Sequence, residues 1–153
     1  MSKRVRLSFV EEDVKAFAEL NEEDAPITSE LIMKILPIKS DVIHDIWSGK
    51  IVFMFIEPTI VIPFEGVPRS GRLLPGDIFY WYSPKNYLYG KPYGKNGYSE
   101  IGFAYGRDCM PACTRGPKRV NVFATITAGL DDFAEVCSRM IYEGKKKLCM
   151  RDD

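Results

Sequence analysis

The chain has 153 residues and a mass of 17.4 kDa, which suits a single domain that buries roughly two-thirds of its unfolded surface. Hydrophobic residues make up 46% of the chain and charged residues 27%, which argues against a disordered protein or a coiled coil. The 21 basic and 21 acidic side chains balance to zero net charge, which disfavours nucleic acid as a partner.

No segment predicts a membrane span. The longest wholly apolar run is Ile51–Ile56, which is far too short for a bilayer-spanning helix. The N-terminus also lacks the apolar core of a signal peptide. We therefore expect a cytoplasmic protein with no membrane partner.

The first third of the chain predicts a hairpin followed by a helix. Alternating apolar residues predict strands over Arg4–Val10 and Val14–Leu20, joined by an acidic turn. Asp24 as the N-cap and Pro26 in the first turn then predict a helix, which Pro37 ends.

The middle of the chain predicts strands separated by loops rich in glycine and proline. We expect a strand over Val42–Trp47, with His44 and Trp47 on opposite faces. The run Ile51–Ile56 predicts a strand buried on both faces, and Ile60–Ile62 predicts a short strand. Further strands are expected over Asp77–Tyr82, Ser99–Tyr105, Val120–Ile126 and Lys147–Met150.

A second helix is predicted over Asp131–Tyr142, because apolar residues recur on one stripe and Gly144 follows as a stop. The overall order of elements lacks the strand–helix alternation of a parallel α/β fold. We therefore predict a mainly β domain, a closed eight-stranded antiparallel barrel capped by two α-helices.

Short segments of the sequence resemble the cyclophilins. The run from Asp24 to Thr28 resembles the Ala-Pro-x-Thr start of a cyclophilin helix. Other segments resemble the prokaryotic cyclophilin-like proteins of unknown function, namely Leu36-Pro37, Ile46–Gly49, Gly76–Ile78, Glu100–Gly106 and Asn121–Ile126. The resemblance implies the same closed barrel with two helical caps.

The resemblance also argues against prolyl isomerase activity. In true cyclophilins an arginine follows the strand histidine and donates hydrogen bonds that stabilise the twisted amide. Here Asp45 follows His44, and a carboxylate can only accept hydrogen bonds. A shared fold does not by itself carry the activity.

The cysteines do not form a zinc-site pattern. Cys109 and Cys113 are close, but a second pair is missing and the single histidine is distant, whereas Cys137 and Cys149 fit core positions. We expect neither a metal nor a cofactor. The sequence leaves open whether Cys109 and Cys113 are free, bridged or metal-bound.

Aromatic residues are concentrated between Phe79 and Tyr105, which hold ten of the chain's 19 (nine Phe, eight Tyr and two Trp). Such density suits a binding surface, because Tyr and Trp pair an apolar body with a polar tip. The other interpretation is barrel core together with a contact between subunits, which would indicate a homodimer.

Strand alternation does not decide whether Glu100 is buried. A buried Glu100 would need a partner such as Arg115, His44 or Asn121, because an unpaired buried carboxylate is costly and its pKa rises. A carboxyl group of that kind is a candidate functional residue.

We predict a cleft in the side of the barrel that binds a small anionic or aromatic molecule, or a peptide. Its expected ligand-binding residues are Trp47, Trp81, Glu100, Tyr105, Arg107 and Asn121. The catalytic candidates His44 and Glu100 leave an enzyme as an alternative, either a residual prolyl isomerase or a small hydrolase. A single-strand nucleic-acid binder that uses the basic segment 85–119 is a further alternative.

Overall fold

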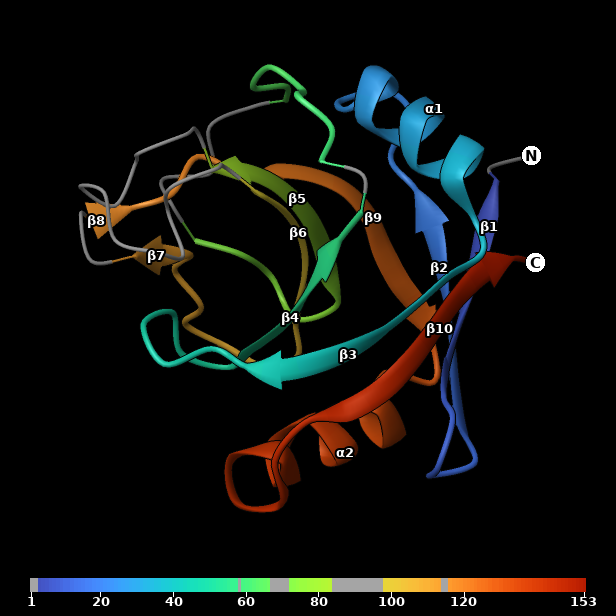
Figure 1. Cartoon of the computed structure of the whole chain (residues 1–153), viewed down its shortest axis with the longest axis vertical. Helices are drawn as coiled ribbons and strands as arrows, with labels where there is room; N and C mark the ends of the chain where they lie inside the picture. Colours follow the sequence, from blue (N-terminus) through green and yellow to red (C-terminus); the bar gives the residue numbers. More distant parts are fainter. Residues whose placement is uncertain (1–2, 58, 67–71, 84–97, 114–115) are drawn as a thin grey trace.

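Eight antiparallel strands close into a barrel, with two helices packed against it (Figure 1). The computed structural model describes residues 3–57, 59–66, 72–83, 98–113 and 116–153. Around the barrel the strands are β1 (Arg4–Phe9), β10 (Lys146–Asp152), β3 (Ile38–His44), β4 (Ile51–Ile56), β6 (Tyr98–Ala104), β5 (Asp77–Ser83), β9 (Asn121–Ala128) and β2 (Val14–Leu20). This arrangement confirms the predicted fold class.

The predicted N-terminal hairpin is present. Arg4 of β1 pairs with Glu19 of β2, and β10 occupies the other side of β1 with Val5 opposite Asp152. The two ends of the chain therefore lie side by side (Figure 1). Closure gives every barrel strand two neighbours, and the shortest ladder joins β3 to β4 at Ile43 with Phe53 and His44 with Val52.

The barrel interior is filled by apolar side chains, and a helix closes each side. Phe133 of α2 (Leu130–Glu143) packs 5.0 Å from Phe9 and 5.8 Å from Phe103, measured between ring centroids. Ile32 of α1 (Pro26–Ile35) is fully buried in the same core. Neither described helix is long and apolar enough to cross a bilayer.

The strand predicted over Val42–Trp47 is wrong in its position. β3 begins earlier because β10 pairs with it as far as Ile38, and it ends at His44. After His44 the backbone N–H of Trp47 donates to the carboxylate of Asp45 at 2.6 Å, which turns the chain out of the sheet. His44 and Trp47 therefore do not lie on opposite faces of one strand.

Two expectations about the next apolar segments are also wrong. On β4, Met54 and its alternate neighbours face the core, but Phe55 on the outer face remains 49% exposed. Residues 60–62 form no strand, because the N–H of Ile60 donates to the hydroxyl of Ser99 at 2.9 Å instead of joining a ladder. The outer face of β4 is thus left open.

The N-terminus of α1 is capped from a distance rather than by Asp24. The N-cap is Ala25, whose side chain cannot accept a hydrogen bond. The carboxylate of Glu65 accepts the backbone N–H of Ile27 at 2.9 Å and that of Thr28 at 2.8 Å. This carboxylate therefore satisfies donors that a helix leaves unpaired at its start.

Asn121 holds the loop that carries this capping carboxylate. Its amide oxygen accepts the backbone N–H of Glu65 at 2.8 Å. Its amide nitrogen donates to the carbonyl of Pro63 at 2.9 Å and to the hydroxyl of Thr28 at 3.1 Å. Asn121 thus joins β9, the loop and α1.

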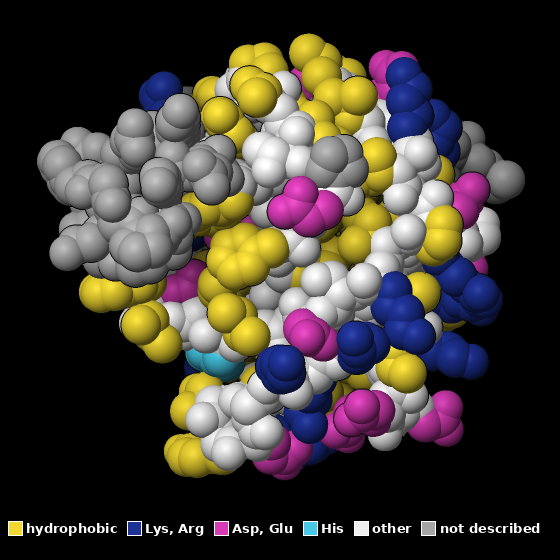
Figure 2. All heavy atoms as spheres, viewed as in Figure 1, with side chains coloured by type: hydrophobic (Ala, Val, Ile, Leu, Met, Phe, Trp, Pro, Cys, Tyr) yellow, Lys and Arg dark blue, Asp and Glu magenta, His cyan; other side chains and the backbone are white. Residues whose placement is uncertain are grey.

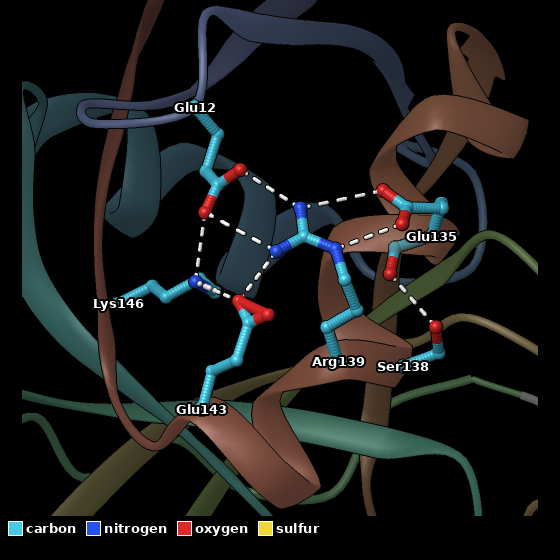
Figure 3. Close-up of polar contacts among 6 residues, drawn as sticks. All are labelled: Glu12, Glu135, Ser138, Arg139, Glu143 and Lys146. Carbon is cyan, nitrogen blue, oxygen red and sulfur yellow. Dashed lines mark hydrogen bonds and ion pairs between the residues drawn. The ribbon is translucent and has the colours of Figure 1, made fainter.

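Charged side chains gather around α2 and β10 (Figure 2). The guanidinium of Arg139 lies among Glu12 of the β1–β2 turn, Glu135 and Glu143 (Figure 3). Lys146 at the start of β10 contacts Glu12 at 2.7 Å and Glu143 at 2.8 Å. This network joins the hairpin turn, the helix and the last strand.

The segment after β6 covers part of the outer face of the barrel. The short strands β7 (Ala112–Cys113) and β8 (Gly116–Pro117) pair within the region that was expected to be a loop. Cys109 packs with Ile51 and Phe79 in a second apolar cluster outside the main core. This segment does not cover the part of β4 that carries Phe55.

Candidate ligand-binding cleft

A cavity of about 390 Å³ lies against the outer side of the barrel. We call it the barrel-side cleft, and its lining residues come from the end of β3 and the following turn, β4, β6, and the segment that contains β7 and β8. They are Ile43, His44, Asp45, Ile46, Trp47, Phe53, Phe55, Tyr98, Glu100, Cys113 and Lys118.

The strand registers bring the lining residues together. Phe55 of β4 lies opposite Glu100 of β6, and Phe53 lies opposite Ile43 of β3. Because side chains alternate along a strand, Phe53 and Phe55 share the outer face of β4, and Tyr98 and Glu100 share that of β6. The outer face of three adjacent strands therefore forms one wall.

That wall is aromatic and ordered by ring contacts. Phe53 and Phe55 meet edge to face with centroids 5.3 Å apart, and Phe55 meets Tyr98 in the same way at 5.0 Å. Edge-to-face pairs place the positive edge of one ring on the negative face of the next. More than half of Trp47 is exposed, so this ring is accessible to solvent at the cleft.

A buried ion pair forms the polar part of the lining. The ammonium of Lys118 lies 2.8 Å from a carboxylate oxygen of Glu100, and the two side chains are 6% and 2% exposed. The same ammonium lies 4.3 Å from the ring centroid of Trp81 and 6.0 Å from that of Phe53. Opposite charge and aromatic faces thus surround the lysine.

Burial shifts the protonation of Glu100. Loss of solvation raises the pKa of this carboxyl above its ordinary value, while the charge and hydrogen bond of Lys118 oppose the rise. The negative charge of Asp45 raises the pKa of Glu100 further. Desolvation is the largest of these influences because the carboxyl is almost fully enclosed.

Asp45 is a second buried acid in the cleft. It is 7% exposed, and its carboxylate accepts the N–H of Trp47. Within the described part of the chain no lysine, arginine or histidine forms an ion pair with Asp45. The described lining therefore holds two buried carboxylates and one paired ammonium.

The imidazole of His44 is engaged at both nitrogens. Nδ1 lies 2.6 Å from the backbone carbonyl oxygen of Asp45, and Nε2 lies 2.6 Å from the hydroxyl of Tyr105. A carbonyl only accepts, so Nδ1 carries a proton, and Nε2 shares a hydrogen bond with the hydroxyl of Tyr105. His44 is therefore held in place rather than turned freely toward a ligand.

The structure separates the six residues predicted for ligand binding into three groups. Trp47 and Glu100 line the cleft, as does the catalytic candidate His44. Trp81 lies behind Lys118, and Tyr105 lies behind His44. These two buried aromatics lie outside the described lining and contact side chains that belong to it.

Arg107 and Asn121 lie outside the lining of the cleft. β6 ends at Ala104, so strand alternation does not continue to Arg107, which is exposed. Asn121 is occupied by the loop that caps α1. Arg115, a predicted partner of Glu100, lies outside the described residues, as do residues 85–97 of the basic segment.

Sequence reasoning missed Lys118 as the partner of Glu100, and it missed Phe53 and Phe55 as lining residues. The position of Lys118 in a basic segment was its only signal. Phe53 and Phe55 belong to the unbroken apolar run Ile51–Ile56. Such a run does not show which face of the strand is buried and which is exposed.

No disulfide joins any of the four cysteines, all of which lie within the described residues. The thiol of Cys109 donates toward the carbonyls of Gly106 at 3.1 Å and Lys50 at 3.2 Å, and burial raises its pKa. Cys113 lies in the lining of the cleft. No group of three His, Cys, Asp or Glu side chains among the described residues is placed to hold a metal ion.

Comparison with known proteins supports the barrel. A family model described as a protein of unknown function, DUF3830, matches residues 7–151. No curated protein sequence matches the chain. The predicted relationship to cyclophilins stays a prediction.

Two solved structures share the fold. The structure of McbB in complex with tryptophan has a TM-score of 0.61 and 13% identity, covering 97% of this chain and 44% of that one. The solution structure of the hypothetical protein AF2241 from Archaeoglobus fulgidus has a TM-score of 0.56 and 21% identity, covering 99% and 95%. The chain thus spans less than half of McbB, and identities this low show the fold alone.

Proposed function

The chain belongs to the DUF3830 family of proteins of unknown function, and we propose that it binds a small aromatic molecule in the barrel-side cleft. The observation that carries the proposal is the open aromatic wall. Phe55 remains half-exposed although β6 pairs with its strand at this position, and it continues a row of rings that borders the cavity.

The size and lining of the cleft support this proposal. Its volume of about 390 Å³ falls within the range of small-molecule sites, which combine apolar walls with a few polar groups. Covering Phe55 and Trp47 with a flat ring would remove apolar surface from water, at roughly 25 cal/mol for each Å². An aromatic ligand would therefore gain from the part of the wall that the chain leaves open.

An aromatic ligand fits this cleft better than an anionic one. Lys118 is the only lysine or arginine among the described lining residues, and Glu100 already neutralises it. Arg107, which was expected to hold an anion, lies outside the lining. Among the described lining residues, a carboxylate or phosphate would have to displace Glu100 to reach the ammonium of Lys118.

One structural neighbour suggests a suitable probe. McbB has the same fold, and it has been solved with tryptophan, whose side chain is an indole ring. Indole is accordingly a reasonable first ligand, although the likeness between the two proteins does not by itself transfer a binding site.

Isothermal titration calorimetry with indole tests the proposal. The wild-type protein should bind indole saturably, and Phe55→Ala should weaken binding about tenfold because it removes the centre of the wall. Tyr142→Ala is the matched control, because this ring is 90% exposed and lies outside the lining. Equal binding by all three proteins, or no binding of indole, phenol or naphthalene by the wild type, would contradict the proposal.

A second candidate, an acid–base enzyme, is favoured by the burial of the Glu100 carboxyl group in the lining of the cleft. A buried carboxyl with a raised pKa can exchange a proton nearer to neutral pH than an exposed one. The reactions to assay are isomerisation of a prolyl tetrapeptide and hydrolysis of a p-nitrophenyl ester. Turnover above the uncatalysed rate that Glu100→Gln abolishes would support an enzyme, and the absence of turnover on both substrates would reject it for these reactions.

A further inference from the structure

We propose that the barrel-side cleft selects aromatic ligands that carry a positively charged amine, with the carboxylate of Asp45 as the counter-ion. This inference rests on the proposed function and adds to it the charge of the ligand. It follows from the balance of charge in the lining, from the environment of Asp45, and from the rings beside it.

The first step is the balance of charge. Lys118 and Glu100 form a close pair, so their charges cancel within the lining. Asp45 then remains as a carboxylate that no described lysine or arginine neutralises. A cleft with this lining attracts a cation and repels an anion.

The second step is the burial of Asp45. Only 7% of the residue is exposed, and its carboxylate accepts the N–H of Trp47 at 2.6 Å. Removing a carboxylate from water is costly unless a positive charge or several hydrogen bonds replace the lost solvation. A ligand amine beside Asp45 would provide such a charge.

The third step is the mutual influence of the acidic groups. Loss of solvation raises the pKa of both Glu100 and Tyr98, and the nearby negative charge of Asp45 raises it further. A cation bound beside Asp45 would reduce this repulsion. The free protein therefore holds an unfavourable interaction that a positively charged ligand relieves and a negatively charged ligand increases.

The fourth step is the aromatic surroundings. Trp47 follows Asp45 by two positions in the sequence, and both residues belong to the same turn. Phe55 and Tyr98 form the neighbouring wall. Aromatic faces attract ammonium groups, and Lys118 already lies over Trp81 in this part of the molecule. The ring and the amine of one small ligand thus both find complementary groups.

A charge series on one ring tests the inference. Indole, tryptamine and indole-3-propionate share the ring and differ in charge, so calorimetry at about pH 7 and low salt isolates the charge. We expect the wild-type protein to bind tryptamine about tenfold more tightly than indole, and indole-3-propionate more weakly than indole.

Asp45→Asn identifies the counter-ion. The amide keeps an oxygen that accepts the N–H of Trp47 but loses the charge, so the preference for tryptamine over indole should fall to less than twofold. Asp108→Asn is the matched control, since it removes the same charge from an exposed side chain outside the lining. If Asp45→Asn does not fold, Asp45→Ser also keeps an acceptor and takes its place.

The outcomes separate this inference from the proposed function. Equal affinity for indole and tryptamine in the wild type, or a tryptamine preference that survives Asp45→Asn, would overturn the role of Asp45 while leaving an aromatic site in place. Tighter binding of indole-3-propionate would reverse the charge of the ligand. Failure of all three compounds to bind would overturn both proposals.

Discussion

The ammonium of Lys118 lies 2.8 Å from the carboxylate of Glu100, and both side chains are almost fully buried. Glu100 belongs to β6, whereas Lys118 follows β8 in the segment that crosses the outer face of the barrel. The pair therefore fastens that segment to the barrel and also forms part of the cleft. A change at either residue should affect both stability and ligand binding.

Loss of the ammonium should be strongly destabilising. Lys118→Met leaves Glu100 buried without its counter-ion, and we expect the free energy of unfolding to fall by about 3 kcal/mol. Urea unfolding at about pH 7 measures this. The control Arg72→Met breaks an exposed pair with Asp108 and should cost less than about 1 kcal/mol. An equal loss of unfolding free energy in the two variants would show that burial does not make the Lys118–Glu100 pair more important for stability than an exposed pair.

Glu100 should make the protein less stable as the pH rises. Its folded pKa lies above the ordinary value of 4.5, so the folded state binds a proton that the unfolded state has released. The resulting stability is fully present below about pH 4.5 and is lost as the pH rises through the folded pKa. As the pH rises, the urea midpoint should fall less steeply in Glu100→Gln than in the wild type. Parallel curves for the two proteins would contradict a raised pKa of Glu100 in the folded state.

Two tyrosines should resist ionisation in the folded protein. Burial raises the pKa of Tyr98 and of Tyr105 from 10.0 to about 12. The unfolded state therefore loses these protons first, and the stability they contribute is lost as the pH rises from about 10 to about 12. At about pH 11, absorbance at 295 nm should increase when urea is added, and Tyr105→Phe should reduce that increase. Full ionisation before urea is added would be incompatible with the burial of these hydroxyls.

The charge network around Arg139 should set the response to acid. Hydrogen bonds from Arg139 and Lys146 lower the pKa of Glu12 from 4.5 to about 2. The stability linked to Glu12 is present above about pH 4.5 and is lost as the pH falls toward about 2. Thermal unfolding between these pH values should show a weaker acid dependence in Glu12→Gln. The control is Glu11→Gln, because Glu11 forms no ion pair with another described residue. If the acid dependence weakened equally in this variant, the change in net charge and not the Arg139 network would explain the effect.

The distant helix cap should contribute measurably to stability. Glu65→Ala removes the acceptor for the N–H groups of Ile27 and Thr28, and we expect a loss of about 1 kcal/mol in urea unfolding. Glu65→Gln keeps one acceptor oxygen and should lose less. Glu57→Ala, at an exposed position after β4, is the matched control. Wild-type stability in Glu65→Ala would mean that water replaces the carboxylate without cost.

The position of β3 shows where local patterns mislead. Alternation from Val42 to Trp47 looks like a strand, yet Asp45 accepts the N–H of Trp47 and turns the chain. Polar residues such as Lys39 and Ser40 belong to the strand because β10 pairs with them. Pairing with a distant strand thus outweighed the local hydrophobic pattern.

The sequence by itself determined the closed β-barrel with its two helices, because alternation of period two and helical stripes report directly on which faces are buried. It also indicated Trp47, Glu100 and His44 as cleft residues through their rarity or chemical type. Only the tertiary structure decided that Lys118 pairs with Glu100, that Phe55 stays open, and that Glu65 caps α1. These contacts join residues far apart in the chain, and their geometry depends on strand register and on the path of the loops, which periodicity within one segment does not encode.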